Sequence, residues 1–266
     1  MPKLQPIALL IGGLGLFAIA TLGQGEAPKG VDPSAVTPDW ATDAAPNVQT
    51  GRSSLVRLDI QLGEGGSRQT IVAMHGMGDT AEHFSYLLRD YPGPAKLLLP
   101  QAPTAYSKGW SWFPTRVAET GVEVMAAHVI AATDEVSELL QDLIDADPAH
   151  KKVVVTGFSQ GGMLSYALAV RHPEQVGLAI PVSGWLPEPL WPDAPPPGAP
   201  PIRALHGERD RVLPLAPTLA GVEHLKAKGW DAALQTYAGA GHAVTPPMLA
   251  ELWRQLDESP VGRAPR

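Results

Sequence analysis

The sequence of 266 residues contains no cysteine. Disulfides, metal sites with thiolate ligands and a cysteine nucleophile are therefore excluded. Basic residues are also few, with 20 lysines and arginines against 27 aspartates and glutamates, and the net charge is −7. Because no basic cluster is present to neutralise phosphates, we expect no nucleic acid among the partners of this chain.

Charge is absent from a long stretch near the N-terminus. Lys3 precedes an uncharged run from Leu4 to Gly25, and its apolar part, Ile7 to Ala20, has the length typical of a secretory signal. Ala18-Ile19-Ala20 supplies a cleavage site, so we expect residues 1–22 to be a signal peptide that exports the protein to the periplasm or out of the cell. The alternative is an uncleaved membrane anchor, through which alone the chain would contact a membrane.

Composition divides the rest of the chain. Residues 23–52 are rich in glycine, proline, alanine and aspartate and lack periodicity, which predicts a disordered linker. Residues 53–258 are long enough to bury one sizeable core and form the expected catalytic domain. Residues 259–266 are expected to be a flexible tail.

Strand-like and helix-like segments alternate from Ser53 onward. The predicted strands are Leu55 to Leu62, Thr70 to His75, Lys96 to Leu99, Lys152 to Gly157, Val176 to Val182, Ile202 to His206 and Ala232 to Tyr237. The predicted helices are Thr80 to Tyr91, Val122 to Asp145, Gln160 to Arg171, Ala216 to Lys228 and Thr245 to Leu256. This alternation predicts an α/β fold with a mainly parallel central sheet and helices on both faces.

The transition from the fourth strand to the third helix carries a catalytic motif. Val153-Val154-Val155-Thr156 leads into Gly157-Phe158-Ser159-Gln160-Gly161-Gly162. A serine between glycines, after a strand and before a helix, is typical of a nucleophile elbow, which holds the hydroxyl clear of the backbone. The helix then directs its free N–H groups at the reaction centre, so it stabilises negative charge there. We predict that Ser159 is a nucleophile.

A serine nucleophile needs a base and an acid, and two later loops supply them. Asp210 follows the strand that ends at His206, and His242 follows the next strand. The order serine, acid, histidine, with each residue after a strand, is that of α/β-hydrolases. Glu208 is the alternative acid. A surface role for Asp210 and a capping role for His242 are the non-catalytic interpretations.

Two backbone N–H groups are expected to bind the oxyanion. One belongs to Gln160, directly after the nucleophile, and the other to Met77, in the loop after the strand Thr70 to His75. His75, Asp79 and His83 have the spacing of helical metal ligands. Gly76 and Gly78 make a helix through them improbable, so we expect no metal site there.

Short motifs follow one another along the chain: His75-Gly76-Met77-Gly78-Asp79-Thr80, Pro100-Gln101-Ala102-Pro103, Ser111-Trp112-Phe113, Gly157 to Gly162, Val182-Ser183-Gly184-Trp185-Leu186-Pro187, His206-Gly207 with Asp210, and Gly241-His242. In this combination the chain resembles the phospholipase/carboxylesterase family of small α/β-hydrolases, which includes the acyl-protein thioesterases. The resemblance implies a triad of Ser159, Asp210 and His242, an oxyanion hole of Met77 and Gln160, and an α/β-hydrolase fold without a large lid. The chain departs from the family at Pro114, where members commonly have aspartate, and in residues 104–109.

The expected activity is hydrolysis of small to medium carboxylic esters through an acyl-enzyme, with no metal or organic cofactor. Trp112, Phe113, Met163 and Trp185 are predicted to line the substrate cleft, and ordinary core packing is the alternative for them. The substrate is a small molecule or a polymer-borne ester. Other possibilities are an exported polysaccharide or polyester esterase, an acyl-thioester or lysophospholipid hydrolase, and an inert binding module on the same fold.

Overall fold

The computed structural model describes residues 52–64, 68–114, 120–147 and 151–262. The predicted signal peptide or anchor lies outside these ranges, and so does the predicted linker except for Arg52. In the described ranges, no helix has both the length and the apolar character needed to span a membrane.

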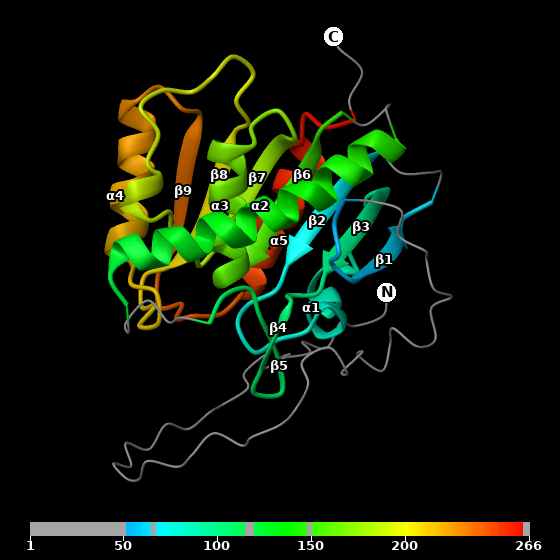
Figure 1. Cartoon of the computed structure of the whole chain (residues 1–266), viewed down its shortest axis with the longest axis horizontal. Coiled ribbons are helices and arrows are strands. Elements are labelled where there is room, and N and C mark those ends of the chain that lie inside the picture. The colour runs from blue at the N-terminus through cyan, green and yellow to red at the C-terminus, as the bar shows by residue number, and fades with distance from the viewer. Residues whose placement is uncertain (1–51, 65–67, 115–119, 148–150, 263–266) are drawn as a thin grey trace, which may run out of the picture.

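One sheet forms the centre of the molecule (Figure 1). Its strands are β1 (Arg57–Leu62), β2 (Gln69–Met74), β3 (Ala95–Pro100), β6 (Val153–Phe158), β7 (Val176–Val182), β8 (Ile202–Gly207) and β9 (Ala232–Tyr237). Their order in space is β1-β3-β2-β6-β7-β8-β9, and β1 alone among them runs antiparallel to its neighbour. The mainly parallel sheet predicted from the alternating pattern is therefore confirmed.

Helices cover both faces of this sheet. They are α1 (Ala81–Leu88), α2 (Val122–Ala146), α3 (Gln160–Arg171), α4 (Leu215–Ala227) and α5 (Pro246–Glu258). Because successive strand residues point to opposite faces, neighbouring residues of β2 enter different cores. Val72 packs with residues of α2, α3 and α4, whereas Ile71 packs with residues of α1 and α5.

The strand register brings the predicted site segments together. Met74 at the end of β2 pairs with Gly157 near the end of β6, so the loop with Met77 emerges beside the turn with Ser159. Gly207 at the end of β8 pairs with Tyr237 at the end of β9, so the loops with Asp210 and His242 also emerge as neighbours. All of these segments leave the sheet at the carboxyl ends of parallel strands, where α/β proteins bind ligands.

Three features differ from the sequence prediction. A hairpin of β4 (Thr104–Tyr106) and β5 (Gly109–Ser111) was not predicted, and it lies beside the carboxyl end of β2 (Figure 1). A short 3-10 helix, Glu188–Leu190, was also not predicted. The predicted tail from residue 259 begins too early, because Ser259 and Val261 are buried and Val261 packs into the core shared with α1 and α5.

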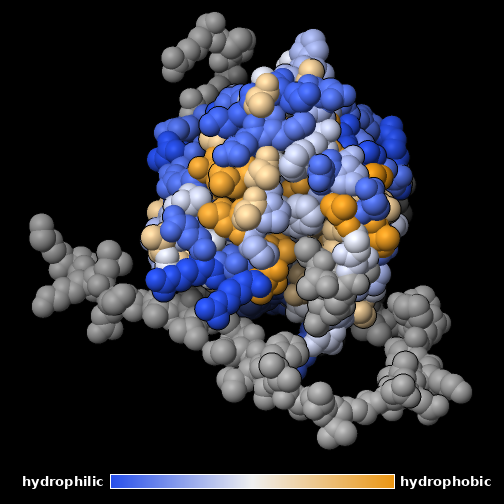
Figure 2. All heavy atoms as spheres, turned by 90° about the vertical axis from the view of Figure 1, so that its left-hand side faces the viewer, coloured by the Kyte–Doolittle hydropathy of each residue, from blue (hydrophilic) through white to orange (hydrophobic). Residues whose placement is uncertain are grey.

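The surface over α4 and β9 is mixed in character. Figure 2 shows this side of the molecule, where hydrophilic side chains predominate and hydrophobic ones are interspersed among them. β9 is an edge strand, and only its first residue, Ala232, is fully buried. A short edge strand of this kind offers few unpaired backbone groups to other chains.

Candidate active site

Ser159 occupies a sharp turn between β6 and α3. Its φ of 57° and ψ of −115° lie outside the regions that a serine ordinarily adopts. Such a conformation costs about 1–3 kcal/mol and persists only where surrounding contacts hold it. The turn is held by Ser159 N–H, which donates to Val182 O over 3.0 Å.

Two glycines allow the strand, the turn and the helix to pack this closely. A Cβ on Gly157 would lie 2.5 Å from the backbone of Gly161. A Cβ on Gly161 would overlap the carbonyl oxygen of Met74 in the neighbouring strand. The backbones of β2, β6 and α3 therefore meet without intervening side chains, which explains the glycines of the motif.

Ser159, His242 and Asp210 are hydrogen-bonded in series. Ser159 Oγ lies 2.9 Å from His242 Nε2, and His242 Nδ1 lies 2.7 Å from Asp210 Oδ2. These distances are within the range required between a nucleophile, its base and the orienting acid. The histidine side chain is 16% exposed and the Asp210 side chain is fully buried.

The surroundings of Asp210 favour its ionised form. Burial alone raises the pKa of this carboxyl group, but the hydrogen bond and the charge of His242 lower it. Asp210 Oδ1 also accepts the N–H groups of Val212 and Leu213 over 2.9 and 2.8 Å, which lowers the pKa further. The net result is a pKa below the usual value for aspartate, so the group stays an acceptor for the imidazole.

The buried side chain of His206 supports the loop of Asp210, a role that the motif His206-Gly207 did not reveal. His206 Nε2 donates to Leu213 O over 2.8 Å and lies 3.6 Å from Asp210 Oδ2. Burial lowers the pKa of His206, which keeps it neutral near pH 7. Its position at the end of β8, four residues before the acid, was the available signal.

The loop after β2 lies directly against the turn. A Cβ on Gly76 would lie 3.4 Å from Ser159 Cβ, so the next residue, Met77, comes close to the serine. Among the described residues, no hydrogen-bond acceptor is assigned to Met77 N–H. Gln160 is the first residue of α3, where a backbone N–H lacks an intrahelical acceptor. Both N–H groups remain available for an oxyanion beside Ser159.

His75 fixes the shape of this loop from within the core. Its side chain is fully buried, and Nδ1 donates to Gly76 O over 2.8 Å. Nε2 accepts from Ala102 N over 3.1 Å and from the Gln101 side chain over 2.9 Å. Burial lowers the pKa of His75 and so favours the neutral imidazole. A neutral imidazole has one donor nitrogen and one acceptor nitrogen, as these hydrogen bonds require.

The side chain of Gln160 joins the two sides of the site. Its Oε1 accepts from Trp112 N over 3.0 Å, and its Nε2 donates to Phe113 O over 2.9 Å. Trp112 Nε1 in turn donates to His75 O over 2.9 Å. Gln160 and the backbone of His75, two residues before Met77, are thus linked through one buried hydrogen-bond network, which fixes the loop after β2 relative to the start of α3.

Comparison with known proteins identifies the family of this chain. The model of the phospholipase/carboxylesterase family matches residues 57–259, which is most of the chain. The chain belongs to this family. All of the site residues described above lie within the matched region.

Individual relatives are distant in sequence. Acyl-protein thioesterase 1 of Gibberella zeae is 26% identical over 204 residues, covering 69% of this chain and 87% of the relative. A probable inactive carboxylesterase of Oryza sativa subsp. japonica is 28% identical over 193 residues, covering 65% of this chain and 78% of the relative. The crystal structure of esterase PE8 superposes with a TM-score of 0.68 at 24% identity, covering 77% of this chain and 99% of that one. The chain therefore has the α/β-hydrolase fold predicted from its motifs.

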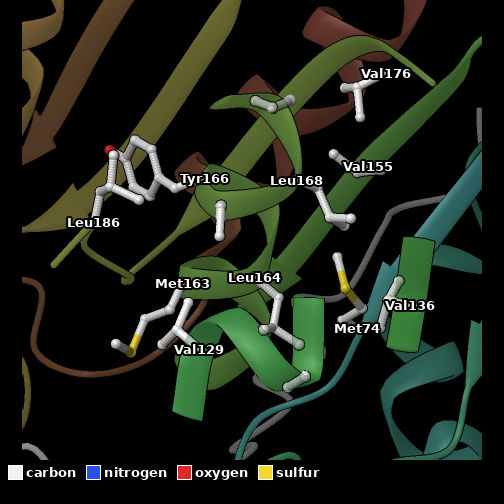
Figure 3. Close-up of a cluster of buried hydrophobic side chains, with 14 of the residues drawn as sticks. Met74, Val129, Val136, Val155, Met163, Leu164, Tyr166, Leu168, Val176 and Leu186 are labelled. Carbon is white, nitrogen blue, oxygen red and sulfur yellow. The ribbon is translucent and has the colours of Figure 1, made fainter. Parts of the chain in front are cut away.

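The motif residues predicted to line the cleft mostly pack in the core. Trp112, Phe113 and Met163 are at most 4% exposed, so the alternative of core packing holds for them. Figure 3 shows Met163 beside Val129 of α2, on the side of α3 that faces this helix. Trp185 is half-buried and packs against the same cluster. Nearly all of α3 is buried, so its apolar residues serve packing first.

His75, Asp79 and His83 do not converge. His83 Nδ1 lies 2.7 Å from Asp79 Oδ1, whereas both ring nitrogens of His75 bond to other groups. α1 begins only at Ala81, after Thr80, whose hydroxyl accepts the N–H of His83 and caps the helix. Within the described ranges, no group of three or more potential metal ligands is found.

Proposed function

We propose that this member of the phospholipase/carboxylesterase family is a serine hydrolase of small to medium carboxylic esters, acting through an acyl-enzyme. The observation that carries the proposal is the hydrogen-bonded series Ser159–His242–Asp210 at the start of a helix. A serine in a strained turn, with a base at 2.9 Å and a buried acid behind the base, is arranged for nucleophilic attack.

In the first step Ser159 Oγ attacks the ester carbonyl carbon, and its proton passes to His242 Nε2. Asp210 holds the imidazole in the required tautomer and stabilises the imidazolium. The negative charge on the former carbonyl oxygen is accepted by the N–H groups of Met77 and Gln160. One such donor contributes about 10²- to 10³-fold to kcat. The bond to the alcohol oxygen then breaks, and His242 gives its proton to that oxygen.

In the second step water attacks the acyl-enzyme. His242 takes a proton from the water, the tetrahedral oxyanion forms again between Met77 and Gln160, and the bond to Ser159 Oγ breaks as the proton returns to it. The products are the alcohol, the carboxylic acid and the free enzyme. The chemistry uses only these side chains and backbone groups.

We also propose that residues 1–22 export the enzyme, which then meets esters outside the cytoplasm; an uncleaved anchor is the alternative. Export favours polysaccharide- or polymer-borne esters as an alternative substrate class.

The thioesterase among the relatives favours a second alternative, acyl thioesters, because the same acyl-enzyme forms from an ester or a thioester. Because one relative is named a probable inactive carboxylesterase, the esterase activity of this chain has to be measured directly.

The test is hydrolysis of p-nitrophenyl acetate and butyrate by the full-length protein. Ser159→Ala and His242→Ala should each lower kcat by about 10³-fold or more, and the double variant should lose little beyond either one, because the groups act as a unit. Thermal unfolding must show that the variants are folded. A folded Ser159→Ala protein with an unchanged rate would refute the proposal, and a preference for butyryl thioesters over matched esters would favour the thioesterase alternative.

A further inference from the structure

A small cavity lies beside the base, among side chains of the core that α1 and α5 cover. Its volume is about 70 Å³, and the ring of His242 forms part of its wall. The apolar walls come from Phe84 and Leu87 of α1, Phe158 at the end of β6, and Val244, two residues after the base. The rings of Phe158 and His242 lie 4.7 Å apart between centroids.

We propose that this cavity is a subsite for the alcohol part of the ester, and that it selects short, apolar and uncharged alcohols. The proposal rests on the proposed function. His242 must deliver its proton to the leaving alcohol oxygen, so the alcohol lies on the imidazole side of the serine. The cavity is lined by His242, whereas Ser159, Met77 and Gln160 are not among its walls. The group attached to the leaving oxygen is therefore the part of the substrate that reaches it.

The size of the cavity limits the alcohol. Its volume of about 70 Å³ is several times the roughly 10–15 Å³ that a cavity needs to hold one water molecule, so it has room for a group of a few heavy atoms. An alcohol of two or three carbons fills this space, and longer chains extend beyond it. Each methylene buried in the cavity should raise kcat/KM by about fourfold, because burial of apolar groups favours binding.

A carboxylate at the edge of the cavity should also select alcohols by their charge. Asp79 and His83 belong to its wall, and the side chain of His83 is 53% exposed. Asp79 pairs with His83, and the described ion pairs include no lysine or arginine at this carboxylate. An alcohol that carries a carboxylate would be repelled here, whereas a neutral one would not.

The test uses acetate esters of methanol, ethanol, 1-propanol, 1-butanol and 1-hexanol with the full-length enzyme. These leaving groups differ little in acidity, so kcat/KM should rise by about tenfold or more from methyl to propyl and then level off or fall. Methyl esters of acetic, propionic and butanoic acid form the reference series. Hydrolysis of methyl acetate tests the proposed function itself, so a protein inactive on every ester would refute ester hydrolysis. An active protein whose kcat/KM does not change along the alcohol series would refute the alcohol subsite.

Variants of Val244 test the subsite directly, because this half-buried residue lies on a loop, where a change of side-chain size disturbs the packing of the core least. Val244→Phe should fill the cavity and bring the propyl-to-methyl ratio close to one, and Val244→Ala should shift the preference to butyl and hexyl esters. Val124→Phe is the matched control, since Val124 is 48% exposed on α2 and should leave the ratio unchanged. Unchanged alcohol preference in both Val244 variants, or a change in the acyl series instead, would overturn the proposal.

Asp79→Asn tests the charge selection. Asparagine keeps an oxygen for the bond from Thr80 N, which is 2.8 Å long, but removes the negative charge. The rate on O-acetylglycolate relative to propyl acetate should rise several-fold in this variant. An unchanged ratio would show that the carboxylate plays no part in selection.

Discussion

Asp210 and Glu208 lie two residues apart on the loop after β8, in different surroundings. The Asp210 side chain is fully buried, accepts two backbone N–H groups and bonds to His242. Glu208 is exposed and accepts the hydroxyl of Thr236 over 2.9 Å. At the scale of single residues, Asp210 is therefore the one of these two that can orient the base.

The contrast between these acids gives a matched pair of variants. Asp210→Asn should lower kcat by about 10⁴-fold, because the amide stabilises the wrong tautomer of His242. Glu208→Gln should change kcat by less than about tenfold, because this side chain is engaged at the surface. Steady-state kinetics on p-nitrophenyl butyrate, with circular dichroism to check folding, measures both. The reverse ranking would assign the acid to Glu208.

The sequence predicted Ser159, Asp210 and His242, but it did not predict the contacts that hold them in place. Ser159 stands in a local motif, and Asp210 and His242 follow strands, so position along the chain identified them. The hydrogen bonds of His75 and His206 reach segments that meet only in the folded chain, so sequence position places these residues beside the site but does not predict their partners. Met163 follows the motif directly, but sequence alone does not tell which side of a buried helix such as α3 faces the cleft.

At the scale of elements, the site depends on close contact between β2, β6 and α3. Backbone atoms of Met74, Gly157 and Gly161 approach one another without side chains between them. This contact holds the turn of Ser159 beside the loop of Met77. A methyl group added at the contact must move one of the three elements.

Gly161→Ala tests this contact. The added Cβ would overlap Met74 O, so we expect a loss of about 3 kcal/mol or more in the free energy of unfolding and a lower kcat. Gly121→Ala is the control, because no atom lies within 4 Å of a Cβ at that position at the start of α2. Urea unfolding should show a change within about 1 kcal/mol there. Equal stability of the two variants would contradict the account of the turn.

The larger elements were predicted to within about two residues at most of their ends, because hydrophobic periodicity and flanking glycines and prolines mark them. Helix α3 and strands β7 and β9 were predicted at their observed bounds. The hairpin of β4 and β5 was missed, since its strands are three residues each and lack an alternating pattern. It is fixed instead by bonds to the loop after β2, from Gly78 N to Trp110 O and from Trp110 N to Asp79 O.

At the scale of the whole molecule, stability should depend on pH through two buried histidines. Burial lowers the pKa of His75 and of His206 in the folded state. Well above about pH 6.5, the ordinary pKa of histidine, both are neutral in folded and unfolded chains, so their contribution is complete. As pH falls below that value the unfolded chain binds protons that the folded chain excludes, and stability is lost down to the lowered pKa.

We therefore expect the free energy of unfolding to fall between pH 7.5 and 5.5, with a limiting slope of about 1.4 kcal/mol per pH unit for each of the two histidines. Urea unfolding at several pH values measures this. His75→Gln should remove the contribution of one histidine from this slope, and His206→Asn should do the same. A stability that is constant or rises over this range would contradict the burial argument.

The N-terminal proposal is also a property of the whole chain. Cleavage after Ala20 should leave a mature protein that begins near Thr21 and is found outside the cytoplasm. An anchor would instead keep the full-length chain in the membrane fraction after a carbonate wash. Intact-mass spectrometry of protein from its native host distinguishes the two, and a full-length protein in the soluble cytoplasmic fraction would refute both.

The central claim is that ester hydrolysis passes through a covalent intermediate on Ser159. The most direct measurement is acid quenching of the enzyme during turnover of p-nitrophenyl trimethylacetate, whose bulky acyl group slows attack by water, followed by peptide mass spectrometry. We predict one trimethylacetyl group per chain, on Ser159, formed with a matching burst of p-nitrophenol and absent from Ser159→Ala. An acyl group on another residue, or turnover by folded Ser159→Ala at the normal rate, would contradict the claim.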